Sequence, residues 1–291
     1  MNKLVTIAIP FYNPGPAFED AIKSVFAQTY TNWELLLVND GSTDDSLEKA
    51  LAIKDSRVRV INDGKNLGLG ARLNQIAQLA SGEYLARMDA DDIMHPERIE
   101  KQVTFLENNS YVDVVDTGAI IIDINGQPVG ISHIKEKLPT AYELLKKGGF
   151  LHPSIMAKKK WFLNNPYDPK YLRTQDRELW ARTFFRSRFA HLPEPLYFYR
   201  FEGNIRVKAY LSSYFYERKV IRRYGPQMIG LGPSTYLYLR SLSKSVVLIF
   251  LSILKMEQII TRRNYHPIPE ILREEVSALL AQIRAHKVPG W

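Results

Sequence analysis

The first 110 residues alternate short apolar runs, rich in β-branched residues, with stretches of helical periodicity. Such alternation predicts strand–helix–strand units around a mainly parallel sheet. The expected strands are residues 4–9, 34–38, 58–61 and 84–88, and the expected helices are residues 16–29, 44–53, 69–80 and one that opens at Pro96. We therefore expect a three-layer α/β domain whose ligands bind where the carboxyl ends of the strands open into a crevice.

The pattern changes after residue 110. Residues 112–116 and 120–124 are expected to be strands, and the Asn125-Gly126 pair that follows is a hairpin signal, so antiparallel strands should join the sheet. Further helices are expected at residues 140–147, 177–185 and 207–224. Breaks are expected at Gly225-Pro226 and at residues 230–233.

Composition and charge narrow the functions open to the chain. Its 291 residues include no cysteine, which excludes a thiolate nucleophile and a zinc–thiolate site and leaves carboxylates and histidines as metal ligands. Residues 1–130 hold 11 Lys and Arg against 19 Asp and Glu, whereas residues 131–291 hold 28 against 12. The acidic part suits a cation, and the basic part suits phosphates on a substrate, a nucleic acid or an anionic membrane. No nucleic-acid reading module accompanies the charge, so we expect no nucleic-acid partner.

The sequence predicts neither a membrane span nor export. Its longest apolar run, residues 246–254, is about half of the roughly 18 residues that a span needs. The first ten residues lack the longer apolar core and the small-residue cleavage site of a signal peptide. We therefore expect a cytoplasmic protein.

Acidic residues follow two of the expected strands. The second strand runs into Asn39-Asp40-Gly41-Ser42 and the fourth into Asp89-Ala90-Asp91-Asp92. An oxygen-only cluster of this kind suits Mg²⁺ or Mn²⁺, with substrate phosphates completing the coordination. The alternative is an acidic helix N-terminus ahead of Pro96.

Several short segments follow one another in a fixed order. They are residues 9–13, 24–30 and 34–44, then Asn66, Gly68 and Asn74, then residues 82–92, and Gln175-Asp176 before Leu179-Trp180. In order and spacing they resemble the large inverting glycosyltransferase family 2, which has the GT-A fold. The resemblance covers residues 4–205 and implies a Rossmann-like three-layer domain with a mainly parallel sheet and a few antiparallel strands.

The resemblance implies a nucleotide-binding role for residues after the first two strands. Tyr12 would stack on the base, Pro10 and Asn13 would shape its pocket, and Asp40 would accept a hydrogen bond from the base. An aromatic face with one acceptor is a sufficient site for a flat ring that bears an N–H. The alternatives are a strand-end aromatic for Tyr12 and a turn residue for Asp40.

The diphosphate and its ion would be bound further along the chain. By resemblance, Asp89 contacts the ribose or the metal, and Asp91 holds the ion that bridges the diphosphate. Asn74 belongs to the same nucleotide-sugar motif, and Arg200 falls where relatives place an arginine on the diphosphate. Arg72 either reaches that diphosphate or is a solvated helix charge.

The resemblance also places a base and an acceptor pocket. Asp176 would deprotonate the acceptor hydroxyl, so that direct attack inverts the anomeric configuration; its alternative is a helix N-cap. His152 and Trp180 would lie on the acceptor side, although His152 can equally be a buried structural histidine. Two residues depart from the family pattern. Relatives commonly have a glutamate at the position of Gln175 and often a histidine at the position of Glu202.

The basic C-terminal region carries an apolar stripe. Residues 239, 242, 246, 249, 253, 256 and 260 recur at spacings of three and four, which predicts one long helix over about residues 234–263. Three arrangements fit such a stripe: packing on the catalytic domain, a coiled-coil seam in a homodimer, and a helix in a membrane interface. Net positive charge favours contact with an anionic membrane.

These observations lead to one leading hypothesis. Residues 1–205 form a GT-A domain, with a nucleotide-sugar half at about 1–110 and an acceptor half at 111–205, and residues 206–291 form a helical region that associates with a membrane or dimerises. The chain would be a metal-dependent inverting glycosyltransferase that uses a nucleotide diphosphate sugar and a glycan or lipid-linked acceptor, at the inner face of the membrane, in bacterial surface polysaccharide biosynthesis. The alternatives are a catalytically silent nucleotide-sugar-binding or membrane scaffold protein and a nucleotidyltransferase.

Overall fold

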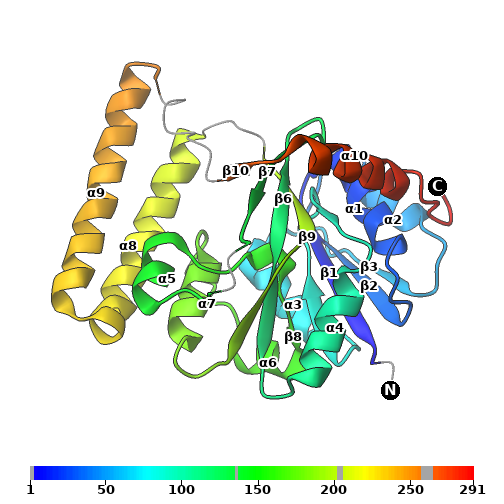
Figure 1. Cartoon of the computed structure of the whole chain (residues 1–291), viewed down its shortest axis with the longest axis horizontal. Coiled ribbons are helices and arrows are strands. Elements are labelled where there is room, and N and C mark those ends of the chain that lie inside the picture. The colour runs from blue at the N-terminus through cyan, green and yellow to red at the C-terminus, as the bar shows by residue number, and fades with distance from the viewer. Residues whose placement is uncertain (1–2, 135–136, 202–205, 257–264) are drawn as a thin grey trace.

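The computed structural model describes residues 3–134, 137–201, 206–256 and 265–291. Its centre is one mixed sheet in the order β10-β7-β6-β8-β4-β1-β2-β3, with β9 beside β6 and β5 beside β9 (Figure 1). The strands are β1 (Val5–Phe11), β2 (Trp33–Asn39), β3 (Val58–Ile61), β4 (Tyr84–Arg87), β5 (Ile93–Met94), β6 (Val114–Ile122), β7 (Pro128–Ser132), β8 (Met156–Lys158), β9 (Phe189–Arg200) and β10 (His266–Pro267).

Helices cover both faces of the sheet. They are α1 (Ala17–Phe26), α2 (Ser46–Ala52), α3 (Leu69–Leu79), α4 (Arg98–Asn108), α5 (Ala141–Lys147), α6 (Lys159–Asn164), α7 (Gln175–Thr183), α8 (Val207–Ile229), α9 (Leu231–Ile253) and α10 (Glu270–Arg284). The apolar side chains of α1 and α4 share one core cluster with one face of the sheet, and those of α3, α6 and α7 share a second cluster with the other face. The expected three-layer α/β architecture is therefore confirmed.

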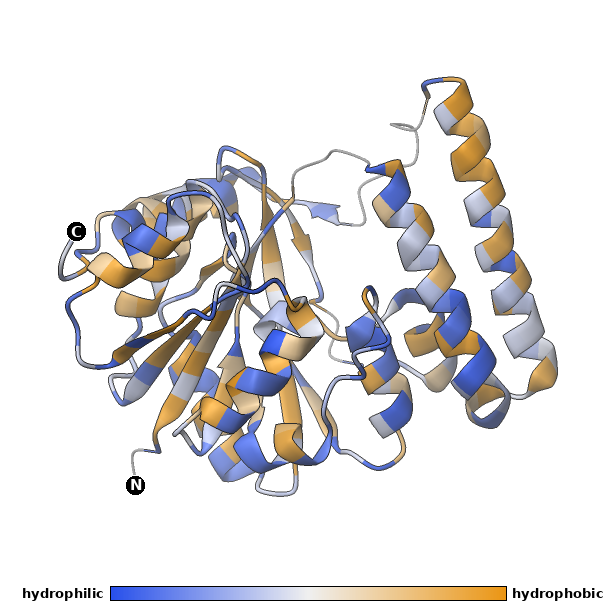
Figure 2. Ribbon diagram, turned by 180° about the vertical axis from the view of Figure 1, so that it is seen from behind, coloured by the Kyte–Doolittle hydropathy of each residue, from blue (hydrophilic) through white to orange (hydrophobic). Residues whose placement is uncertain are grey.

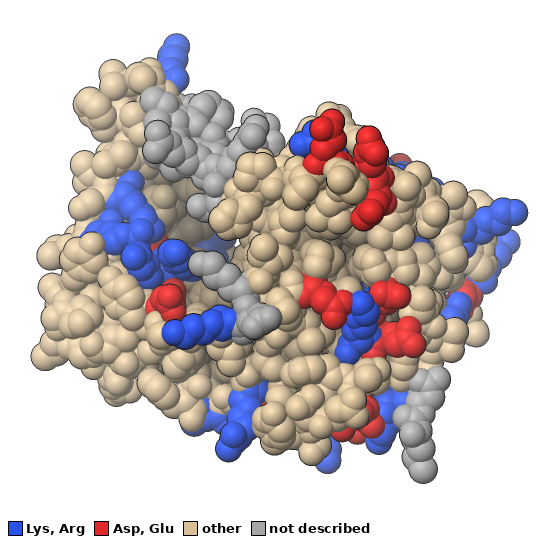
Figure 3. Space-filling model, in the orientation of Figure 1, with Lys and Arg blue, Asp and Glu red and all other residues tan. Residues whose placement is uncertain are grey.

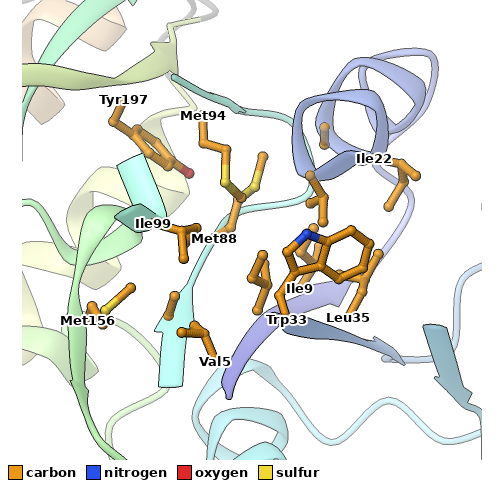
Figure 4. Close-up of a cluster of buried hydrophobic side chains, with 14 of the residues drawn as sticks. Val5, Ile9, Ile22, Trp33, Leu35, Met88, Met94, Ile99, Met156 and Tyr197 are labelled. Carbon is orange, nitrogen blue, oxygen red and sulfur yellow. The ribbon is translucent and has the colours of Figure 1, made fainter. Parts of the chain in front are cut away.

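The parallel part of the sheet forms because its strands are apolar on both sides. β1 and β2 are fully buried and pair in parallel, from Val5 opposite Trp33 to Phe11 opposite Asn39. Figure 4 shows Val5 and Ile9 of β1 beside Trp33 and Leu35 of β2 within the core. A strand that is buried on both faces reads as a continuous apolar run, as these two do. Their carboxyl ends therefore meet at one edge of the sheet.

The antiparallel part differs from the sequence-based expectation in one respect. The expected strands 112–116 and 120–124 are a single nine-residue strand, β6, whose pairing with β9 shifts register between Thr117 and Ala119, where Gly118 allows β9 to approach closely. A side chain at Gly118 would meet the carbonyl oxygen of Pro193 at 2.6 Å. The hairpin at Asn125-Gly126 is confirmed, because β6 and β7 pair across it and Gly126 has a φ of 72°.

The C-terminal helices also depart from expectation. α8 continues through Gly225-Pro226 to Ile229, and the chain breaks only at Gly230, whose φ is 84°. Proline removes a single backbone donor, and Gly225 allows a close approach of α9, since a Cβ there would lie 2.7 Å from Ser234 Oγ. α9 ends at Ile253 instead of running to residue 263. Residues 257–264 of the expected helix lie outside the described residues.

The last 26 residues pack against β7 and α1 instead of extending the pair of long helices α8 and α9. β10 pairs with β7, and α10 lies beside α1 (Figure 1). Beyond α10, Val288 is buried in the main core, and the Pro289 carbonyl accepts a hydrogen bond from the Lys54 amide at 2.7 Å. Residues 206–291 are therefore not one helical block.

α9 also bears on the expectation that nothing spans a membrane. By length and composition alone, its 23 residues could cross a membrane. Polar residues, among them Arg240 and Lys244, interrupt its apolar sequence. Leu237 and Leu248 on one side of α9 are buried, and α9 packs against α8. Figure 2 shows apolar residues concentrated in its C-terminal half.

Candidate active site

A cavity of about 810 Å³ opens at the carboxyl ends of β1 and β4. The predicted residues among its lining are Pro10, Tyr12, Asn13, Asp89, Asp91 and Arg200. Three further charged residues line the cavity without belonging to any sequence motif, namely Asp20, Arg206 and Arg284. A larger depression of about 1060 Å³ lies between α1, α2 and the chain's last residues, and none of the predicted site residues lines it.

The loop after β1 presents an aromatic ring to this cavity. Tyr12 lines the cavity and is 55% exposed, so its ring is accessible to a ligand. Asn13 has a φ of 47°, and its side-chain oxygen accepts hydrogen bonds from the amides of Thr43 at 2.7 Å and Asp44 at 3.2 Å. Asn13 therefore ties the loop after β1 to the loop after β2 and fixes the position of Tyr12.

Asp40 lies below the cavity rather than in its wall. Its carboxylate accepts hydrogen bonds from the amides of Leu67 at 2.7 Å and Gly68 at 3.1 Å, and from Arg72 Nε at 2.9 Å. Arg72 is fully buried, so it is not a solvated helix charge; it also pairs with Asp63 at 2.7 Å. That guanidinium lowers the pKa of Asp63 far below its usual range. Asp40 and Arg72 together hold the loop that leads into α3.

Asn74 has a structural partner instead of a position in the cavity. Its side-chain nitrogen donates to the carbonyl of Tyr167 at 2.9 Å, and its oxygen accepts from the Tyr167 amide at 2.8 Å. An asparagine amide satisfies a backbone donor and acceptor together in this way. The structure thus gives Asn74 a link between α3 and the segment before α7, and Asn74 does not line the cavity.

The acidic segment after β4 divides into two groups. Asp89 and Asp91 line the cavity, whereas Asp92 is buried and turned into the core. The Asp92 carboxylate accepts from the Tyr197 hydroxyl at 2.9 Å and from the Arg200 amide at 2.7 Å. Burial, together with the charges of Asp91 and Asp89, raises the pKa of Asp92 well above its usual range. Asp92 therefore anchors β9 to this segment.

Arg87 lies beneath Asp89 and was not singled out from the sequence. Its side chain is 3% exposed, and one terminal nitrogen donates to Asp89 Oδ1 at 2.5 Å. Burial opposes the charge of Arg87, but the nearby carboxylates of Asp89 and Asp176 raise its pKa. Arg98, fully buried, donates to the Arg87 carbonyl at 2.8 Å and fixes the end of β4.

Arg200 lines the cavity at the end of β9. Its Nε donates to the Asp91 carbonyl at 2.7 Å, and a terminal nitrogen lies 3.3 Å from Asp20. The guanidinium is therefore held beside the acidic segment by the Asp91 backbone and by Asp20. Glu202, which departs from the family pattern, lies outside the described residues.

Asp176 lies in the first turn of α7, outside the cavity lining. The N-cap is Thr174, so the N-cap interpretation of Asp176 is wrong; a carboxylate in the first turn still favours the helix dipole. Asp176 acts electrostatically on Arg87 and on Tyr167, two groups on which Asp89 also acts. Asp176 and Asp89 therefore both stabilise the charge of Arg87.

The two residues expected on the acceptor side are buried. Trp180 is fully buried among the aromatic rings of the second core cluster, so it cannot contact an acceptor in this conformation. His152 is 8% exposed, and its Nε2 lies 2.8 Å from the Tyr167 hydroxyl. Burial and the Arg87 charge lower the pKa of His152 well below its usual value. The structural interpretation of His152 is the one that agrees with the structure.

The donor set for a metal ion consists of two carboxylates. Asp89 and Asp91 share the cavity wall, and in the described parts of the chain no three or more His, Cys, Asp or Glu side chains are placed so that together they could hold a metal ion. Magnesium and manganese ions keep several waters and take substrate phosphates as ligands, so two protein carboxylates suit them. The residues present thus fit such an ion when a diphosphate is bound.

Comparison with known proteins decides the family. The family model of glycosyl transferase family 2 matches residues 6–179. The chain belongs to this family. EpsE of Bacillus subtilis, named as a glycosyltransferase, is 32% identical over 243 residues, or 81% of this chain and 86% of EpsE. WfgD of Escherichia coli, named as a UDP-Glc:alpha-D-GlcNAc-diphosphoundecaprenol beta-1,3-glucosyltransferase, is 31% identical over 177 residues, or 61% of this chain and 68% of WfgD.

Solved structures confirm the GT-A fold of this family 2 glycosyltransferase. TarS 1–349 of S. aureus, in complex with UDP-GlcNAc, has a TM-score of 0.60 at 14% identity, covering 97% of this chain and 88% of that chain. The mannosyltransferase PcManGT from Pyrobaculum calidifontis, in complex with GDP-Man and Mn²⁺, has a TM-score of 0.58 at 14% identity, covering 96% and 84%. At such identities the likeness concerns the fold alone.

Proposed function

We propose that this glycosyltransferase moves one sugar from a nucleotide diphosphate sugar to a hydroxyl of a glycan or lipid-linked glycan, with inversion and with a divalent ion. The observation that carries the proposal is that the exposed ring of Tyr12 lines the same cavity as Asp89 and Asp91. An aromatic face suits a base, and two carboxylates suit an ion that binds a diphosphate. The names of WfgD and PcManGT support this class of donor and acceptor.

Mn²⁺ or Mg²⁺, held by Asp91 and Asp89, would neutralise the charge on the leaving diphosphate. The chain's own residues do the remaining work. Tyr12 and Pro10 bind the nucleoside, Asn13 keeps their loop in place, and Asp40 supports the pocket from below through Gly68. Arg200 adds a cation at the rim.

Asp176 is our candidate for the base. It lies at the start of α7, partly exposed, and α7 is anchored to α8 by the 3.1 Å pair of Arg177 with Glu217. A carboxylate that takes the acceptor proton while the hydroxyl attacks gives a single displacement and therefore inversion. Arg87, whose positive charge both Asp89 and Asp176 stabilise, would reduce the repulsion between the two carboxylates.

The α9 face is our candidate for contact with the cytoplasmic surface of a membrane. Its exposed residues are apolar or uncharged throughout the helix, among them Leu239, Val246, Phe250 and Ile253. Residues 206–256 hold nine Lys and Arg and one Glu, and Figure 3 shows such cations gathered over α8. Two copies meeting at this region would repel each other, whereas an anionic leaflet would attract it. A lipid-linked acceptor would then be presented to the site.

The test is a donor screen with and without Mn²⁺. A true donor should raise the Tm only when the ion is present, and sugar transfer should fall about 100-fold or more in Asp91→Asn and Asp176→Asn. Exposed Asp45→Asn is the matched control, because the Asp45 side chain pairs with Lys49 and lies outside the cavity lining. Absence of donor binding would refute the proposal, and donor binding without transfer or hydrolysis would support the catalytically silent alternative.

A further inference from the structure

The C-terminal segment brings a cation to the cavity that no sequence motif indicated. Arg284, the last residue of α10, lines the same cavity as Tyr12, Asp89 and Asp91. Its Nε donates to Asp20 Oδ2 at 3.0 Å across a sequence separation of 264 residues, and a terminal nitrogen lies 3.4 Å from the Gly126 carbonyl. Three distant segments therefore meet at the cavity rim.

The position of Arg284 is fixed from both ends of its helix. Before α10, His266 and Pro267 pair with β7, and within it Leu280 and Ile283 are buried in a core cluster with β6. After α10, the Pro289 carbonyl is bonded to the Lys54 amide. A helix held at both ends presents its last side chain in one place, so Arg284 belongs to the built wall of the cavity.

Asp20 is shared by two guanidinium groups. Besides Arg284 it accepts from Arg200 at 3.3 Å, and its side chain is 20% exposed. One carboxylate balances only one of these two positive charges, so Asp20 by itself does not neutralise the pair. Arg284 is 30% exposed and is the less constrained of the two, because Arg200 also donates to three backbone carbonyls.

We propose that Arg284 is a donor-binding residue, whose guanidinium contacts the diphosphate when the nucleotide sugar is bound. This inference rests on the proposed function. A diphosphate carries more negative charge than Asp20, and charge-assisted hydrogen bonds to phosphate are among the strongest that an arginine makes. The last 26 residues, beyond the family motifs, are therefore part of the donor site, and Asp20 competes with the donor for Arg284.

The experiment measures the affinity of the full chain for UDP and GDP by calorimetry in the presence of Mn²⁺. Arg284→Gln should weaken the better of the two ligands about tenfold, which is the loss expected for one charged contact. Asp20→Asn should strengthen it about threefold, because it removes the competing carboxylate. Arg273→Gln, an exposed substitution on the same helix, should change nothing. Uridine and guanosine, which lack phosphates, should bind wild type and Arg284→Gln equally.

The outcomes separate this inference from the proposed function. If wild type binds neither UDP nor GDP, nor any nucleotide sugar, the proposed function fails. If wild type binds but Arg284→Gln binds equally well, only the role of Arg284 is overturned. A purely structural tie between α10 and α1 would lower the Tm in both Arg284→Gln and Asp20→Asn and would not shift their affinities in opposite directions.

Discussion

Arg87 is almost fully buried, and it donates to Asp89, a carboxylate of the cavity wall, at 2.5 Å. Two of its three guanidinium nitrogens have no hydrogen-bond partner among the described residues. A buried cation of this kind is stable because the charges of Asp89 and Asp176 lie close to it. The stability of the buried Arg87 charge therefore depends on the carboxylates of the candidate site.

Replacing Arg87 by Met should affect stability and catalysis together. We expect a loss of about 1–3 kcal/mol in the free energy of unfolding, because Asp89 loses its partner, and a fall of about 100-fold in kcat, because the two carboxylates are no longer screened from each other. Urea denaturation and transfer rates measure the two effects. Arg87→Lys keeps the charge and should recover part of both; equal losses in the two variants would contradict the role of the charge.

Replacing Asn74 by Ala tests its structural role as the partner of the Tyr167 backbone. Both backbone groups of Tyr167 would lose their partner, so unfolding should become easier by about 1–3 kcal/mol. Nucleotide affinity measured under native conditions should stay within about twofold. Gln78→Ala, exposed on the same helix, is the control. A tenfold loss of affinity at unchanged stability would restore the nucleotide-binding interpretation.

Much of the structure of the first 110 residues could be predicted from the sequence. The spacing of apolar residues there differs between the strands and the helices. The strand at Val58–Ile61 was predicted to the residue, and α3 ends one residue before its expected end. The hairpin at Asn125-Gly126 was predicted for the same kind of reason, since a turn with positive φ needs such residues. These are local properties, and local sequence determines them.

The rest depended on contacts between distant residues. β9 contains Pro193 and Pro195, which argue against a strand in its first half, and only Leu196, Tyr197 and Phe198 are fully buried, so its full length is not evident from the sequence. Its partners β5 and β6 hold it in place. The sequence shows charged residues at positions 20, 40 and 284, but it does not show their partners. No local pattern indicates that Asp40 accepts hydrogen bonds from backbone amides or that Arg284 donates to Asp20.

The neutral, buried state of His152 should make stability depend on pH. Because burial lowers its pKa in the folded protein, the unfolded chain binds the extra proton first on acidification. The contribution of His152 is therefore complete above about pH 6.5, the ordinary histidine value, and is lost below it by up to about 1.4 kcal/mol per pH unit. Urea denaturation between pH 8 and pH 5 measures this slope.

His152→Gln should have a shallower slope over the same range, because glutamine does not titrate. His191 is the internal control, since its pairing with Asp116 raises its pKa, so that His191→Gln should remove a contribution of the opposite sign. Parallel slopes for wild type and His152→Gln would show that His152 is accessible to protons in the folded state.

The exposed face of α9 gives the last prediction. Val246 and Phe250 are 65% and 60% exposed and lie one turn apart on a face without charged residues. Burying such side chains in a bilayer interface contributes about 1.5–3 kcal/mol each. The double substitution Val246→Asp with Phe250→Asp should therefore reduce binding to vesicles of phosphatidylglycerol and phosphatidylcholine at least about tenfold, measured by flotation.

Two comparisons make that measurement specific to an anionic membrane. Vesicles of phosphatidylcholine alone, or high salt, should weaken wild-type binding, because the attraction of the cations in residues 206–256 is screened or lost. Leu51→Asp, an exposed leucine on α2, should leave binding unchanged. If wild type instead elutes as a dimer that the double substitution dissociates, and does not bind vesicles, α9 faces a second copy of the chain rather than lipid.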